Sequence, residues 1–288
     1  MSLRELLAAD SIRCVGGIAE GHLDMALSLL AIEPVWLSSI LLVGVMTLVA
    51  MTGPVLVRRC VSLHQLRLNN EVAGFKFATV GVLYAVLLGF AVVTVWEKFN
   101  EAENAVAQEA AALATLYRLS AGIEGDPGAA LREGLTQYVN AAIAEDWPAM
   151  ERGQEGRAVT RALNGAYAAL LTFTPEDARG AAVLTEALRQ LDIVTQARRT
   201  RLVLAPGTTP RVLWFVLSGG AMLTISFTLF FGIENLRAQV AMTGILSFLI
   251  FSGLLIITAI DHPFAGAVRV RPEALSTVVE DFSTQFQP

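Results

Sequence analysis

The chain has 288 residues, of which 54% are hydrophobic and only 16% are charged. Soluble domains carry about 25% charged residues, so this composition is typical of a membrane protein. The net charge of −5 argues against nucleic-acid binding, which needs a basic surface. Two cysteines, Cys14 and Cys60, are too few for a disulfide framework and lack metal-ligand spacing.

Residues 1–34 are expected to form an N-terminal tail that could include an interfacial helix. Glu5, Asp10 and Glu20 fall where a signal peptide has a basic start and an apolar core. We therefore expect no signal peptide, and we expect the first spanning helix to direct insertion into the membrane.

Four segments are long and apolar enough to cross a membrane, which takes about 20 residues because the hydrocarbon core is about 30 Å thick. They are Val35–Val57, Phe75–Trp96, Val212–Ile233 and Val240–Ile260. The last two are joined by a short connection, which predicts an antiparallel hairpin. No stretch alternates with a period of two, so we expect an all-α membrane protein.

The segment between the second and third spans, residues 97–210, is long enough for a soluble helical domain. It is therefore predicted to separate a first pair of spans (35–96) from a second pair (211–260), with a C-terminal tail at 261–288. Basic residues are more frequent on the side that holds both termini and this domain. The positive-inside rule then predicts that these parts face the cytoplasm from the cell inner membrane.

Helices within residues 97–210 are predicted from periodicity and capping signals. The second span is expected to continue to Ala121, and further helices are expected at Gly128–Trp147, ending near Pro148, and at Arg157–Thr172. A last helix is expected to start with Thr174 as N-cap and Pro175 at its first position, and to run to Leu204.

Charged residues of this domain are expected to lie at its surface. Arg198, Arg199 and Arg201 near the end of the last helix suit the helix dipole. The adjacent acids Glu145 and Asp146 are interpreted as surface charges rather than as an acid/base pair.

The second span has no glycine or proline between Gly89 and Gly122, so it predicts one helix of about 45–50 residues, roughly 70 Å long. One face carries small residues at steps of four and suits close helix packing: Gly81, Ala85 and Gly89. A different face could be a second packing face or could line an aqueous path, and both readings stay open. Its residues are Phe77, Tyr84, Leu88, Ala91 and Val95.

Charged residues follow directly after Trp96. Glu97 and Glu101 share one side of the helix, and Lys98 stands between them. They could form a solvated helix face. If several copies surround an axis, they could instead form a charged ring at the mouth of a pore, and rings of acids select cations.

The sequence lacks a catalytic constellation. His22, His64 and His262 are far apart, and no nucleotide-binding, hydrolase or redox motif is present. No carboxylate stands in the middle of a span, which disfavours a proton-coupled transporter. We therefore expect neither an enzyme nor a cofactor or metal site.

The tract Asn69–Leu119, "NNEVAGFKFATVGVLYAVLLGFAVVTVWEKFNEAENAVAQEAAALATLYRL", resembles the bacterial family that carries a bestrophin-like domain. "EDWPAM" at 145–150, the arginine cluster at 198–201 and "DHPFAG" at 261–266 fit the same pattern. One departure is His262, where the family usually shows Arg.

Bestrophins proper are pentameric anion channels with four spans per subunit and a pore lined by the second span. The resemblance therefore implies a homo-oligomer, pentameric by analogy, with membrane lipid and inorganic ions as partners. It places Phe77, Tyr84, Leu88 and Val95 at the axis. Asp261 and His262 would either cap the fourth span or form a proton-sensitive gate.

Two functions follow from these observations. The first is an oligomeric membrane ion channel, anion-conducting by analogy, with its pore lined by the second span. The alternative is a membrane-anchored interaction or sensory protein, in which the long helix is a rigid stalk for an acidic helical domain.

Overall fold

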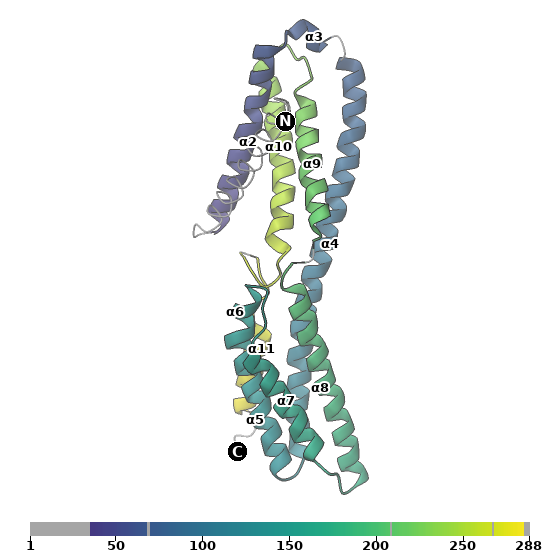
Figure 1. Ribbon diagram of the computed structural model, residues 1–288, viewed down its shortest axis with the longest axis vertical. Helices are drawn as coiled ribbons and strands as arrows, with labels where there is room; N and C mark the ends of the chain where they lie inside the picture. The colour runs from purple at the N-terminus through teal and green to yellow at the C-terminus, as the bar shows by residue number, and fades with distance from the viewer. Residues whose placement is uncertain (1–34, 68–69, 208, 267, 285–288) are drawn as a thin grey trace, which may run out of the picture. The chain divides into compact units, whose positions relative to one another are not determined.

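The computed structural model describes residues 35–67, 70–207, 209–266 and 268–284, and every regular element among them is a helix, as the sequence predicts (Figure 1). The chain forms two compact units. We name Met1–Phe90 with Arg211–Ile256 the apolar unit, and Ala91–Pro210 with Ile257–Pro288 the polar unit. The predicted N-terminal tail, its interfacial helix and the predicted lack of a signal peptide concern residues outside those described.

Among the described residues, four helices are long and apolar enough to cross a membrane, as the sequence predicts. They are α2 (Val35–Cys60), α4 (Asn70–Leu119), α9 (Arg211–Thr228) and α10 (Leu236–Ile260), with the short α3 (Leu63–Arg67) between α2 and α4. The second of them, α4, runs without a break for 50 residues. A single 3-10 turn, Ser120–Gly122, follows it.

The turn between α9 and α10 begins earlier than predicted, because α9 ends at Thr228 and not at Ile233. The side chain of Asn70 binds both backbone groups of Gly232, with its amide donating to the carbonyl and accepting from the N–H, each at 2.9 Å. Arg58 donates to the carbonyl oxygen of Ile233. These bonds replace the helical ones that the backbone would otherwise make.

Large apolar side chains of the apolar unit point outward, which is the reverse of a water-soluble protein. Phe90 is 70% exposed and Phe215 is 81% exposed. Inside, Tyr84, Ala221 and Ile250 form a small core cluster. This distribution is what a helix bundle needs when lipid surrounds it.

Close contact between the apolar helices occurs at glycines. A Cβ added at Gly220 of α9 would lie 2.6 Å from the ring of Tyr84 on α4. A Cβ added at Gly244 of α10 would lie 2.9 Å from the sulfur of Met51 on α2. Small residues therefore set the distance between neighbouring helix axes, as is usual in membranes.

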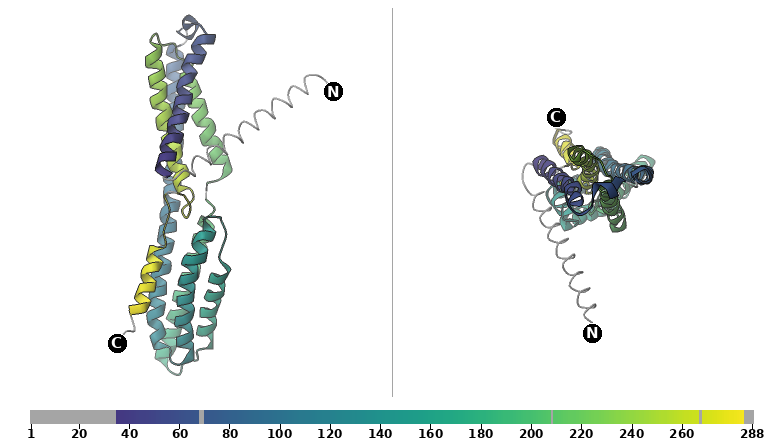
Figure 2. Two further views of the ribbon diagram at one scale, coloured as in Figure 1. Left: turned by 90° about the vertical axis from the view of Figure 1, so that its left-hand side faces the viewer. Right: turned by 90° about the horizontal axis from the view of Figure 1, so that it is seen from above.

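The polar unit packs the second half of α4 against α5 (Asp126–Ala141), α6 (Trp147–Met150), α7 (Arg157–Thr172) and α8 (Ala178–Leu204). Its core is made mainly of leucines contributed by all the longer helices: Leu113, Leu116, Leu131, Leu135, Leu170 and Leu191. A helix that the sequence did not predict, α11 (Glu273–Thr284), packs on α5 (Figure 2). The rings of Phe282 and Tyr117 stack there with centroids 3.8 Å apart.

Two predicted helix ends in the polar unit are wrong. Pro148 does not end a helix: α5 passes into a π-helical turn, Ala142–Asp146, and Pro148 lies in the first turn of α6, where a missing N–H costs nothing. The cap of α8 is Asp177 rather than Thr174, and its carboxylate accepts the N–H of Gly180 at 2.6 Å. Asp is a stronger N-cap residue than Thr, which explains why α8 begins after Asp177.

Candidate functional site

The face of α4 that could have lined a path is packed inside the chain. Phe77 makes an edge contact with Phe231, centroid to centroid 5.5 Å. Tyr84 is buried and donates its hydroxyl hydrogen to the carbonyl oxygen of Leu217 at 3.2 Å. Leu88 fills the space beside Gly253, where an added Cβ would lie 2.8 Å from it.

Ala91 and Val95 continue this face and are 3% and 1% exposed. Of the two readings that the sequence left open for these side chains, the one the geometry supports is a packing face.

The small-residue face of α4 is open. A Cβ added at Gly81 or Gly89 would meet no atom within 4 Å, and Ala85 is exposed. Beside them Val82, Val86 and Val93 are all more than half exposed. No helix among the described residues of one chain therefore packs closely against this face.

The charged residues after Trp96 border a shallow groove of about 480 Å³ between α4 and α8. Glu97 and Glu101 stand on its α4 side, while Ala105 and Ala197 form part of its lining. Lys98 pairs with Glu101 at 2.7 Å. The remaining lining is uncharged and polar: Asn100, Asn104, Gln108, Gln196 and Thr200.

Asp261 and His262 follow α10 in the polar unit. Asp261 is buried, and one carboxylate oxygen accepts the backbone N–H of Thr209 at 3.1 Å and its hydroxyl at 2.5 Å. The half-exposed His262 has its Nδ1 3.8 Å from the other oxygen. This geometry fixes residue 209 beside the end of α10. Both the cap on the fourth span and the gate stay predictions.

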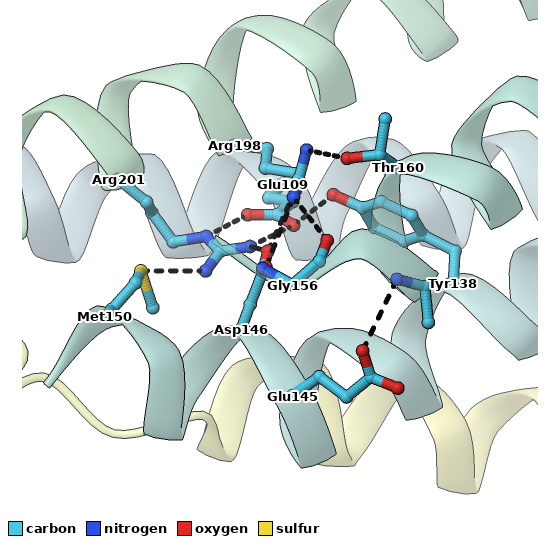
Figure 3. Close-up of polar contacts among 10 residues, drawn as sticks. Glu109, Tyr138, Glu145, Asp146, Met150, Gly156, Thr160, Arg198 and Arg201 are labelled. Carbon is cyan, nitrogen blue, oxygen red and sulfur yellow. Dashed lines mark hydrogen bonds and ion pairs between the residues drawn. The ribbon is translucent and has the colours of Figure 1, made fainter. Parts of the chain in front are cut away.

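A buried network of charges lies at the centre of the polar unit (Figure 3). Arg201 of α8 donates from Nε and Nη2 to the two carboxylate oxygens of Glu109 on α4, at 2.6 and 2.9 Å. Arg198 donates in the same way to Asp146, at 2.8 and 3.2 Å. Arg201 also approaches Asp146 to 3.5 Å, which links the two pairs.

The π-helical turn puts Asp146 at this position. Besides its arginines, Asp146 accepts the backbone N–H of Gly156 at 2.7 Å and so holds the start of α7. The guanidinium of Arg201 lies over the ring of Trp147, 4.5 Å from its centroid. Widened helical turns of this kind often occur where a side chain has a special task.

Tyr138 completes the network from α5, donating its hydroxyl hydrogen to Glu109 at 2.6 Å. Burial raises the pKa of Tyr138 well above 10, and the Glu109 carboxylate adds to that effect. For Arg201, burial alone would lower the pKa, but Glu109 raises it overall. The tyrosine therefore stays protonated and the arginine stays charged at neutral pH.

The network balances two acids with two arginines, and all four are buried. Among the described residues, no cluster of His, Cys, Asp or Glu could hold a metal. The arrangement joins the helices that contribute to it. The lack of an enzymatic activity stays a prediction.

Sequence reasoning missed this network. Asp146 was interpreted as a surface charge and is 0% exposed, and Arg198 and Arg201 were assigned to the helix dipole. One available signal was their spacing: residues 198 and 201 are three apart and share a helix face with buried Val194 and Leu191. Glu109 gave the same signal, between buried Val106 and Leu113 on α4.

Comparisons with known proteins agree with this architecture. The family model of the bestrophin-like domain matches residues 44–275. No curated protein matches the chain.

Among solved structures, a point variant of a bacterial bestrophin homologue from Klebsiella pneumoniae is similar with a TM-score of 0.67 and 15% identity, covering 85% of this chain and 99% of that one. A second variant gives 0.66 and 15%, covering 84% and 99%. Another structure of the homologue gives 0.59 and 16%, covering 85% and 95%. These likenesses show the fold, and the family match covers most of the chain; the chain belongs to the bestrophin-like domain family of membrane proteins.

Proposed function

We propose that this protein is an oligomeric membrane ion channel in which copies of α4 surround the pathway with their open face. The observation that carries this proposal is the open stripe on α4. It runs from the apolar half of the helix into its charged half with no glycine or proline after Gly89. In a ring of copies, these exposed side chains would all point toward one central pathway.

The stripe changes character along its length. The first part of the stripe is apolar, and the second part is polar. The members, at steps of three and four, are Val82, Val86, Gly89, Val93, Glu97, Asn100 and Asn104. In the ring, the valines would form an apolar constriction of the kind that gates by dewetting, and Glu97 would stand just beyond it.

The face assigned to the pathway thus borders the small-residue face and shares Gly89 with it. Phe77, Tyr84, Leu88, Ala91 and Val95 serve the channel indirectly, because their packing fixes the rotation of α4 and so the direction in which the valines point. Membrane topology follows the sequence prediction. The spans lie within 35–96 and 211–260, the domain 97–210 and both termini face the cytoplasm, and the membrane is the inner membrane.

The resemblance to bestrophins implies a pentamer and anion conduction. The stripe favours cations instead, since Glu97 is the one charged residue among its named members. We therefore propose a pathway that prefers cations.

Purified protein in planar bilayers tests both parts of the proposal. Under an asymmetric potassium chloride gradient, the reversal potential should take the sign of potassium permeation. Glu97→Gln should shift it toward zero, and Glu176→Gln, which removes an exposed acid at the start of α8, should not. A reversal potential of the opposite sign would overturn the cation preference.

Persistent silence of intact oligomers across pH, calcium and voltage would overturn the channel itself. So would an oligomer structure in which the open stripe of α4 faces lipid.

The alternative is a membrane-anchored interaction protein. The polar groove between α4 and α8 favours it, because exposed amides and acids on a rigid pair of helices could receive a protein partner. Stable co-purification of one partner with the full chain, lost on Glu101→Arg and kept with Glu176→Arg, would support that function over the channel.

A further inference from the structure

The most buried side of α10 is polar in its first half. Gln239, Thr243 and Ser247 follow one another at steps of four and are 2%, 2% and 0% exposed. Each step advances about 6 Å along the helix. On the same side, Ile250 and Ile257 continue with apolar side chains.

Hydroxyl groups of two other helices lie against this polar side of α10. Thr228 of α9 lies 3.4 Å from Thr243, oxygen to oxygen. Because α9 and α10 run in opposite directions, Thr224, one turn before Thr228, stands level with Ser247. Thr224 is 2% exposed, so it too faces the interior.

The contact between Met51 and Gly244 aligns α2 with α10 in the same way. The two helices also run in opposite directions, as Figure 1 shows and as the bond from Arg58 to Ile233 requires. Thr47, one turn before Met51, is therefore level with Ser247. Three hydroxyls from three helices thus stand at one height inside the apolar unit. With Gln239, Thr228 and Thr243 they form what we name the polar seam.

Three buried oxygens of the polar seam make no hydrogen bond with the protein: Thr47 Oγ1, Ser247 Oγ and Gln239 Oε1. Helical hydroxyls usually bind the carbonyl one turn earlier, as Thr224 does with Gly220 at 2.7 Å and Thr228 with Ile225 at 2.6 Å. Ser247 and Thr47 make no such bond. Orphaned polar groups are expensive inside a membrane protein, so these oxygens favour a partner that the described residues do not supply.

One end of the polar seam is apolar and the other is polar. Next to Ser247 and Thr224, the side chains of Tyr84, Ala221 and Ile250 pack together in an apolar cluster. At the other end, the amide of Gln239 donates to the carbonyl oxygen of Phe231 in the α9–α10 turn at 2.7 Å. The polar seam therefore has an apolar neighbour at one end and a polar one at the other.

We propose that the polar seam is a water-binding site inside the apolar unit. Its ligand is water, because the orphaned groups are neutral hydroxyls and an amide oxygen, which offer both donors and acceptors but no charge. One water at the level of Thr47, Thr224 and Ser247 would find three polar partners, the usual number for a buried water. This site is separate from the open stripe of α4 and does not depend on ion conduction.

Radiolytic oxidation of the full-length protein in lipid nanodiscs tests the proposal, since hydroxyl radicals made from bound water label only neighbouring side chains. Met51 stands one turn from the hydroxyl triad, whereas Met46 of the same helix is 43% exposed on the outer face of the unit. Met51 should be oxidised several-fold faster than Met46, and Thr47→Val with Ser247→Ala should remove the difference. Equal rates in the unchanged protein would overturn the proposal.

Thermal stability gives an independent readout. If water satisfies Ser247, then Ser247→Ala breaks its bonds and leaves Thr47 with one partner fewer, so Tm should fall. If the seam is dry, the same change removes an unpaired buried group and Tm should stay or rise, which would overturn the proposal. Ser218→Ala, an exposed hydroxyl on α9, is the matched control and should leave Tm unchanged.

Discussion

The apolar and polar units hold their helices together with different kinds of side chain. The apolar unit brings its helices together at glycines and keeps large side chains outside, whereas the polar unit buries leucines together with two arginines and two acids. Lipid provides no hydrophobic drive between helices, so close van der Waals contact must hold the first unit. Water drives the second unit together, and its buried charges select one arrangement of the helices.

The largest expected effect is the loss of a buried charge in the polar unit. Arg201→Met leaves Glu109 and Asp146 with less compensation, and removing one partner of a buried pair typically costs about 3–5 kcal/mol. We expect a fall in Tm and rapid proteolysis within residues 97–210. Arg199→Met, an exposed neighbour on the same helix, is the control, and equal losses from both changes would contradict the network.

Next in size is a clash inside the apolar unit. Gly220→Ala would place a methyl group 2.6 Å from the Tyr84 ring, which must move and lose its bond to Leu217. Overpacking of this kind costs about 1–3 kcal/mol. Gly219→Ala provides a matched control one residue away, since its Cβ would meet nothing within 4 Å. Thermal unfolding in nanodiscs should separate the two variants.

The third prediction concerns alkaline pH. The pKa of Tyr138 is raised above 10 in the folded protein, so the unfolded chain releases this proton first. Its contribution to stability is therefore complete below about pH 10 and is lost as the pH rises toward the folded pKa. Tyr138→Phe should flatten the fall of Tm between neutral and strongly alkaline pH. Tyr167→Phe is the comparison, and an unchanged slope in Tyr138→Phe would contradict the assignment.

The smallest effect is expected for an ion pair at the surface of the polar unit. Arg189 lowers the pKa of Glu186 to about 2, yet the pair is exposed, and such pairs contribute little because water and salt screen them. Glu186→Gln should leave Tm at neutral pH unchanged within error. A fall in Tm comparable to that of Arg201→Met would show that burial does not decide how much an ion pair contributes to stability.

Length and apolarity were enough to predict the four spans, and the lack of glycine or proline after Gly89 was enough to predict the unbroken α4. The sequence could not predict which face of α4 turns inward. Both faces are apolar, and small residues can pack against several different neighbours. Only the positions of Gly220 and Gly253 on other helices decide that Tyr84 and Leu88 turn inward.

The candidate charges were harder to predict for a different reason. Asp146 follows a predicted helix and precedes Trp-Pro, where a helix end with surface acids is the ordinary expectation. The π-helical turn changes its direction by inserting one extra residue per turn, and no propensity signals that event. The partners of Asp146 are also distant in sequence, 52 residues away in the case of Arg198.

The unbroken α4 also constrains how the gene can vary. One row of its buried residues has members at intervals of seven and four: Tyr84, Ala91, Val95, Ala102, Glu109 and Leu113. Inserting one residue would turn everything beyond it by about 100°, so that Glu109 would leave Arg201. Insertions and deletions in this helix should therefore be tolerated only in lengths near whole numbers of turns, such as seven or eleven residues. The length of α4, as much as its composition, therefore sets which residues meet in the polar unit.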